Sequence, residues 1–125
     1  MVKDSKVYSY SQLAQMLEAS RTKQIKLANN TTAHFLNDSR IGIRLYYTDI
    51  VIINPDDTYE LHSQGYTTAT TRDRLNGFSP AKVVQKDFTF YVLKNPNERA
   101  IKSNLVSFVE GIAVDRFGIV NPEWL

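Results

Sequence analysis

The stretch from Ile41 to His62 constrains the fold more than any other part of this chain. Residues 41–48 alternate between two sets of side chains, which is the period of a β-strand with one buried face. Residues 50–53 form a continuous apolar run, typical of a central strand that is covered on both faces. The alternation places on the buried side Ile41, Ile43, Leu45 and Tyr47.

The same stretch contains the clearest turn signal in the chain. Residues 54–57 read Asn-Pro-Asp-Asp, so asparagine opens the turn, proline presets φ at the second position and aspartate follows. A further strand over residues 58–62 then completes a hairpin. We therefore expect residues 41–62 to form the centre of an antiparallel sheet.

An N-terminal helix is indicated by a capping signal and by apolar spacing. Ser9 and Gln12 have the spacing of a capping box, in which each side chain bonds the backbone amide of the other residue. Apolar residues follow at helical intervals as far as Leu17. These signals predict a helix over about residues 9–20.

A second, shorter helix is expected after the central hairpin. Thr70 and Asp73 again have capping-box spacing, ahead of residues 72–76, and Gly77 is a suitable C-terminal stop. Leu75 and Phe78 are the expected core residues of this segment.

The other segments read as strands joined by turns. Short strands are expected at residues 24–27 and 31–35, a hairpin over residues 81–93 with its turn at Lys86-Asp87, and a last pair within residues 105–120. We therefore predict an α+β fold in one domain over residues 1–125. An N-terminal helix precedes a β-rich core over about residues 24–120, built as a bent, mainly antiparallel sheet of about six to eight strands with a short inserted helix.

Composition excludes several classes of protein. The 125 residues include no cysteine, which excludes disulfides, thiolate zinc sites and cysteine nucleophiles. No apolar run approaches the roughly 20 residues that span a bilayer, and the polar N-terminus lacks the core of a secretion signal. We expect no membrane partner and an intracellular location.

Catalytic and cofactor motifs are missing from the sequence. The glycines form no phosphate-binding loop, no G-x-S-x-G elbow is present, and the two histidines, His34 and His62, are not closely spaced. We therefore predict no catalytic residues, no metal ligands and no cofactor. One alternative stays open, because a small metal-assisted nuclease would use the acidic residues of the central hairpin, which are Asp49, Asp56, Asp57 and Glu60.

Basic residues are concentrated in the second half of the chain. The formal net charge is only +2, yet residues 72–102 contain seven basic side chains against three acidic ones. Tyrosines accompany several of them, and aromatic faces with nearby cations hold single-stranded nucleic acid. An ordinary solvated surface is the other interpretation of the same residues. The candidate binding residues are Arg44, Tyr46, Arg72, Arg74, Lys82, Lys86 and Tyr91.

Four segments resemble a family of small proteins encoded by bacteriophages and other mobile elements. They match its patterns KxANNT, VRLHxTDIV, PDGTY and TTxDRIN in that order, in segments Lys26–Thr32, Ile43–Val51, Asn54–Tyr59 and Thr70–Asn76. The chain departs from the patterns where Tyr46 replaces His, Asp57 replaces Gly, and Gln64-Gly65-Tyr66 replaces Gly-Gly-Trp. The resemblance implies a phage accessory protein made in the host cytoplasm, and it brings no activity with it.

These observations favour a non-catalytic binding protein of phage type. Its expected partner is a nucleic acid or a host nucleoprotein, including a defence complex that the phage would antagonise. A metal-assisted nuclease and a structural or oligomeric virion component are the alternatives.

Overall fold

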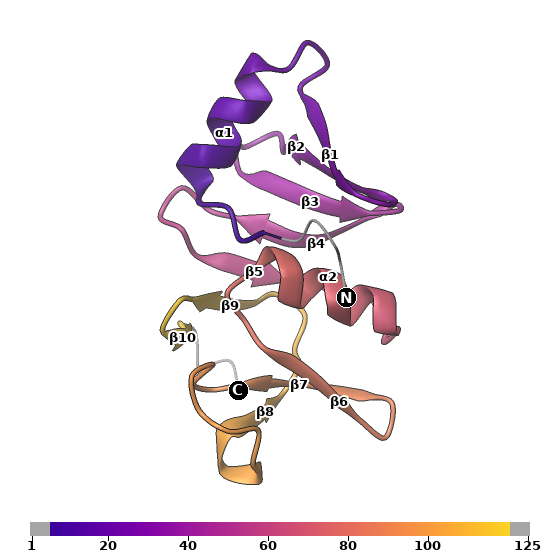
Figure 1. The fold of residues 1–125 in the computed structure, drawn as a ribbon, viewed down its shortest axis with the longest axis vertical. Coiled ribbons are helices and arrows are strands. Elements are labelled where there is room, and N and C mark those ends of the chain that lie inside the picture. Colours follow the sequence, from indigo (N-terminus) through magenta and orange to yellow (C-terminus); the bar gives the residue numbers. More distant parts are fainter. Residues whose placement is uncertain (1–5, 121–125) are drawn as a thin grey trace.

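The computed structural model describes residues 6–120, which form two antiparallel sheets and two α-helices (Figure 1). The helices are α1 (Tyr10–Ala19), α2 (Ala69–Phe78) and a short 3-10 helix, η1 (Lys102–Asn104). The large sheet has the strand order β1 (Gln24–Ala28), β2 (Thr31–Phe35), β3 (Ile41–Leu45), β4 (Thr48–Ile53), β5 (Tyr59–Leu61), β9 (Ile112–Asp115) and β10 (Gly118–Ile119). The small sheet has the order β6 (Val83–Lys86), β7 (Thr89–Leu93) and β8 (Leu105–Ser107).

The α+β class, the N-terminal helix and the inserted helix are confirmed. The division of the strands between two sheets was not expected. It arises because the chain leaves the large sheet after β5, passes through α2, and returns only when Ile112 of β9 pairs with Leu61 of β5. The three strands in between therefore pair with one another.

The register of the large sheet separates an apolar face from a polar face. One row of directly paired residues crosses five strands and is almost completely buried, and it consists of Ala33, Ile43, Val51, Leu61 and Ile112. The adjacent row points to the opposite face and consists of His34, Gly42, Ile52, Glu60 and Ala113. The period-2 alternation predicted for the central strands is therefore present. Ile52 is half-buried on the polar face, so β4 is covered on one face only.

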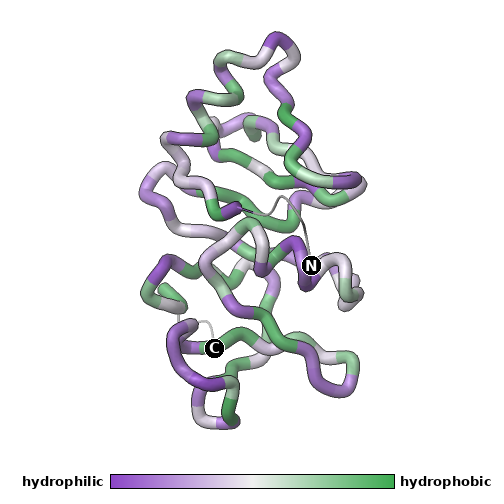
Figure 2. Tube along the Cα trace, in the orientation of Figure 1, coloured by the Kyte–Doolittle hydropathy of each residue, from purple (hydrophilic) through white to green (hydrophobic). Residues whose placement is uncertain are grey.

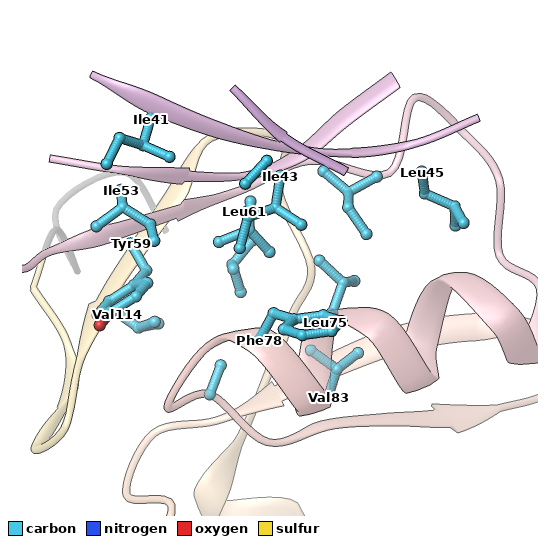
Figure 3. Packing of buried hydrophobic residues seen from close by; sticks show 14 of the residues in the cluster. Ile41, Ile43, Leu45, Ile53, Tyr59, Leu61, Leu75, Phe78, Val83 and Val114 are labelled. Carbon is cyan, nitrogen blue, oxygen red and sulfur yellow. The ribbon is translucent and has the colours of Figure 1, made fainter. Parts of the chain in front are cut away.

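Both α-helices belong to the hydrophobic cluster on the apolar face of the large sheet. Leu13 and Leu17 of α1 are fully buried, as are Leu75 and Phe78 of α2. Figure 3 shows Leu75 and Phe78 beneath the isoleucines of the sheet, with Val83 of β6 on their other side. The same cluster thus joins the two sheets. Figure 2 shows hydrophobic residues concentrated in the strands, and hydrophilic residues at the turn between α1 and β1.

The predicted start of α1 is confirmed, whereas the predicted ends of α2 are wrong. Ser9 and Gln12 form the expected capping box. Helix α2 begins after Thr68, whose hydroxyl accepts a hydrogen bond from the Thr71 amide, and it continues past Gly77 to Phe78. A glycine inside a helix is tolerated when tertiary packing holds the helix, and the buried Leu75 and Phe78 supply that packing.

Two turns lie at positions that differ from the prediction. Tyr46 and Tyr47 connect β3 to β4, so Tyr47 is exposed instead of buried. Asp87 and Phe88 connect β6 to β7, so Phe88 lies outside the strand and is 87% exposed. Both turns contain an aromatic residue with positive φ, at 55° for Tyr46 and 67° for Phe88. Such residues give no sequence signal for a turn, because glycine or asparagine usually occupies these positions.

The β6–β7 turn leads to a prediction about stability. Asp87 and Phe88 both have positive φ, at 52° and 67°, as a two-residue hairpin turn of type I′ requires. A side chain in this conformation costs about 1–2 kcal/mol, which glycine does not incur. Because Phe88 buries little surface, Phe88→Gly should stabilise the protein by about 1 kcal/mol in urea unfolding. Phe88→Ala keeps the strained Cβ and should give no gain; equal stability of the two variants would contradict this explanation.

A second prediction concerns alkaline pH. Burial, with a contribution from the nearby Asp57 carboxylate, raises the pKa of Tyr59 to about 12. The Tyr59 hydroxyl donates a hydrogen bond to the Tyr8 carbonyl oxygen, so the folded state holds the protonated form. A raised pKa contributes stability that is complete below the unfolded value of about 10 and is lost as the pH rises toward 12.

The difference in unfolding free energy between the wild-type protein and Tyr59→Phe measures this contribution. It should fall by up to about 3 kcal/mol between pH 10 and pH 12, since two pKa units correspond to that free energy. Contributions that are common to the two proteins cancel in this difference. A difference that stays constant over this range would contradict the prediction.

Candidate functional site

Three of the sequence-predicted residues lie on the outer face of the small sheet, namely Lys82, Lys86 and Tyr91. Val84, Tyr91 and Ser107 are directly paired across β6, β7 and β8, so they share a face. Lys86 lies two residues after Val84 and faces the same way. Lys82 precedes β6 and lies two residues before Val84; its carbonyl accepts a hydrogen bond from the Leu93 amide, which extends the strand pairing to this lysine.

A third cation joins this face from outside the sheet. Lys102 of η1 lines a hollow of about 470 Å³ together with Lys86 and Tyr91. The remaining lining residues are Ala100, Leu105 and Ser107, so no acidic side chain lines the hollow. We call the surface formed by Lys82, Lys86, Tyr91 and Lys102 the basic face.

The lysines of the basic face are available to a partner. Lys82, Lys86 and Lys102 are exposed, and none of them forms an ion pair with a residue between 6 and 120. The acidic residues nearest to them in sequence are Asp87, next to Lys86 at the exposed hairpin tip, and Glu98, four residues before Lys102, and neither lines the hollow. The surface therefore presents uncompensated positive charge.

The opposite face of the small sheet explains why the basic face points outward. Val83, Phe90 and Val92 are buried on that opposite face. Phe90 also packs edge-to-face against Phe108, with ring centroids 6.0 Å apart. Burial of this apolar side holds the sheet in the core and leaves Lys86 and Tyr91 on the solvent side.

The arginines of α2 hold elements together. Arg74 is only 12% exposed in its side chain, and its guanidinium donates hydrogen bonds to the Thr31 hydroxyl at 2.8 Å and to the Asn29 carbonyl at 3.2 Å. Arg72 Nη1 donates to Gln85 Oε1 at 3.0 Å, which ties α2 to β6. A binding role for Arg74 stays an untested prediction, and its contacts with the β1–β2 turn favour a structural role.

Arg44 and Tyr46 lie apart from the basic face, on the large sheet. Asp49 Oδ1 lies 2.6 Å from His34 Nε2 and 3.6 Å from Arg44 Nε, so these three side chains form one cluster on the polar face. Gly42 makes room for it, because a Cβ at this position would lie 2.7 Å from Asp49 Oδ1. Tyr46 stands at the β3–β4 turn.

The acidic residues of the central hairpin do not converge. Asp49 contacts His34, Asp57 accepts a hydrogen bond from the Tyr10 amide, and Glu60 pairs with Arg40. Hydrogen bonds from the Thr58 hydroxyl and amide hold the pKa of Asp56 below its ordinary value. Within residues 6–120, no group of three or more histidine, aspartate or glutamate side chains is placed to bind a metal ion.

Comparison with protein families gives one result. The family model described as Kyanoviridae Gp96 protein matches residues 10–115. The chain belongs to this family of phage proteins. The match confirms the expected phage origin and includes every residue of the basic face. Comparison with curated proteins and with solved structures finds no match.

Sequence reasoning did not place two residues of this Gp96-family protein at or near the basic face, namely Lys102 and Phe88. Lys102 was counted within the basic stretch, but its segment had no decisive period, so nothing placed it beside Tyr91. Phe88 was assigned to the start of a strand, on the same face as Phe90, whereas it stands exposed at the hairpin tip two residues from Lys86. No helix within residues 6–120 has the length and hydropathy needed to cross a membrane.

Proposed function

We propose that this phage protein is a non-enzymatic binding protein that holds single-stranded nucleic acid on its basic face. The observation that carries the proposal is that Lys82, Lys86 and Lys102 lie on the same face as Tyr91, with no acidic side chain in the hollow that Lys86, Tyr91 and Lys102 line. A strand of nucleic acid offers the two groups that such a surface accommodates, a line of phosphates and a series of flat bases.

The charges suit a phosphate backbone. Lysine ammonium groups neutralise phosphates and release the counterions that surround them, which makes binding favourable at low salt. Lys82 and Lys86 are four residues apart on the same side of β6 and its extension, and Lys102 lies across the hollow from that strand. Three cations are thus spread along a surface instead of meeting at one point, as an extended polyanion requires.

The aromatic residues suit the bases. The Tyr91 side chain is half-buried on the outer face of the central strand of the small sheet, which holds the ring in place. Phe88, at the hairpin tip beside Lys86, adds a second aromatic ring that is exposed to solvent. Stacking of a base on an aromatic ring contributes about 1–3 kcal/mol and tolerates any base sequence. We therefore expect binding with little sequence preference.

Binding of labelled oligonucleotides tests the proposal. Fluorescence anisotropy with single-stranded DNA and RNA of mixed sequence should show binding at about 50 mM salt and much weaker binding at about 200 mM salt. If neither the single-stranded DNA nor the single-stranded RNA binds the protein at the lower salt concentration, the proposal is overturned. Purification from an expressing bacterial cell, with identification of the bound nucleic acid and protein, would show whether the strand belongs to a host nucleoprotein.

A further inference from the structure

A second hollow lies at the edge of the large sheet, beside the start of α2. It has a volume of about 460 Å³, within the range of small-ligand sites. Leu45 and Ile50 give it an apolar surface, and Thr70 contributes a hydroxyl group. Its remaining walls include three tyrosines, Tyr46, Tyr47 and Tyr66, and we call it the tyrosine hollow.

These tyrosines do not contribute to the hydrophobic core. Tyr46, Tyr47 and Tyr66 are 61%, 97% and 62% exposed. By contrast, Tyr59 is 5% exposed and belongs to the core. Exposed aromatic rings gathered at one place are typical of a surface that binds a partner.

Both segments that carry the tyrosines are held in place. The Tyr46 amide donates to the Asn30 carbonyl at 2.8 Å, and the Asn30 side-chain amide donates to the Tyr46 hydroxyl at 3.1 Å. In the loop before α2, the Glu110 carboxylate accepts hydrogen bonds from the Ser63 amide, the Ser63 hydroxyl and the Gln64 amide at 2.7–2.9 Å. The hollow is therefore formed before any ligand arrives, which lowers the entropic cost of binding.

The surroundings of the tyrosine hollow favour a ring that is attached to negative charge. No acidic residue lines it; Asp49 lines a separate hollow on the far side of Tyr47 and Tyr66. Gln85 joins the segment before α2 to the small sheet, since its amide donates to the Thr67 carbonyl at 2.8 Å and its oxygen accepts from Arg72. The next residue, Lys86 of the basic face, lies at the end of β6 and projects from the face opposite to Gln85.

The segments that carry the two surfaces lie along one edge of the molecule (Figure 1). Figure 1 shows the β3–β4 turn, the first turn of α2 and the β6–β7 turn along the same edge. Arg72 follows Thr71, which lines the tyrosine hollow, so a phosphate backbone that runs from the hollow to the basic face would pass Arg72 before it reaches Lys86. A nucleotide combines a flat ring with an adjacent phosphate, whereas an aromatic side chain of a protein partner lacks that charge.

We infer that the tyrosine hollow binds one unstacked base of the single strand that lies on the basic face. The inference rests on the proposed function, and it assigns to the hollow a contact that depends on the base and not on the backbone.

Abasic strands separate this contact from the rest of the interface. An oligothymidylate and an abasic strand of the same length carry equal numbers of phosphates, and only the former has bases. Tyr47→Ala should weaken binding of the oligothymidylate about 10-fold, since one stacking contact is lost, and should leave binding of the abasic strand unchanged. Tyr47→Phe keeps the ring and should bind both strands like the wild-type protein. Phe117→Ala, an exposed aromatic that lines neither surface, is the matched control.

The outcomes distinguish the inference from the proposed function. If Tyr47→Ala binds the oligothymidylate like the wild-type protein, the inference is wrong while the proposed function stands. That result, together with tyrosine-dependent binding of a protein, would assign the hollow to a protein partner and also overturn the inference. If the wild-type protein binds neither strand at low salt, both proposals fail. Because Tyr47 is almost fully exposed, its replacement should leave the unfolding midpoint unchanged.

Discussion

Replacing Phe78 by alanine should destabilise the protein by about 3–5 kcal/mol, the range measured when a large aromatic is removed from a core. Phe78 is fully buried at the C-terminal end of α2, between the large sheet and β6 (Figure 3). Its removal would open a cavity at the place where the two sheets share one cluster, so neither sheet can close over it without moving the other. Urea unfolding followed by circular dichroism measures the change.

Two further variants keep this prediction testable if Phe78→Ala fails to fold. Phe78→Leu retains most of the side-chain volume and should lose less stability than the alanine variant. Phe117→Ala removes the same ring from an exposed hairpin tip and should change stability by less than about 0.5 kcal/mol. Similar unfolding midpoints for the Phe78 and Phe117 alanine variants would show that Phe78 does not join the sheets as described.

Removing the three lysines of the basic face should have the largest effect on binding. The triple variant K82A/K86A/K102A should bind single-stranded nucleic acid about 100-fold more weakly than the wild-type protein at about 50 mM salt, because three phosphate contacts are lost. All three side chains are exposed and form no ion pair within residues 6–120, so the fold should not change. Fluorescence anisotropy gives the affinity, and thermal unfolding checks the fold.

A control variant that loses the same number of positive charges elsewhere separates the role of the basic face from the effect of overall charge on binding. The variant R21A/K23A/K26A removes three cations from the α1–β1 turn and β1, at the other end of the molecule (Figure 1). Both triple variants change the formal net charge from +2 to −1, which is 2 − 3. The control should bind nearly as well as the wild-type protein. Equal losses in the two variants would indicate attraction by overall charge and would contradict a role for the basic face.

Local sequence signals were enough to predict much of the fold. The capping box at Ser9 and Gln12, the turn at residues 54–57 and the helical core residues Leu75 and Phe78 depend on neighbours in the sequence, and all are present. The pairing of β5 with β9 could not be predicted in this way, since the segments between Leu61 and Ile112 offer other strands as partners. Which strands pair is decided by burial of the whole apolar face.

The candidate site shows the same limit. Alternation along β6 and β7 could predict that Lys86 and Tyr91 face outward, and the structure brings them together. No local pattern could show that Arg74 is buried against Thr31, or that Lys102 lies beside Tyr91, because both contacts depend on tertiary packing. Tyr47 was predicted to be buried because the period-2 alternation of residues 41–45 was extended through it. The turn at Tyr46 and Tyr47 interrupts that alternation, and aromatic residues give no signal for a turn.

The salt dependence of strand binding tests the central claim most directly. The logarithm of the binding constant, plotted against the logarithm of the salt concentration, has a slope of about −0.7 for each phosphate that a protein neutralises on a single strand. The slope for K82A/K86A/K102A should therefore be shallower than the wild-type slope by about 2, while R21A/K23A/K26A keeps the wild-type slope. Equal slopes for the wild-type protein and K82A/K86A/K102A would show that these lysines do not contact phosphates.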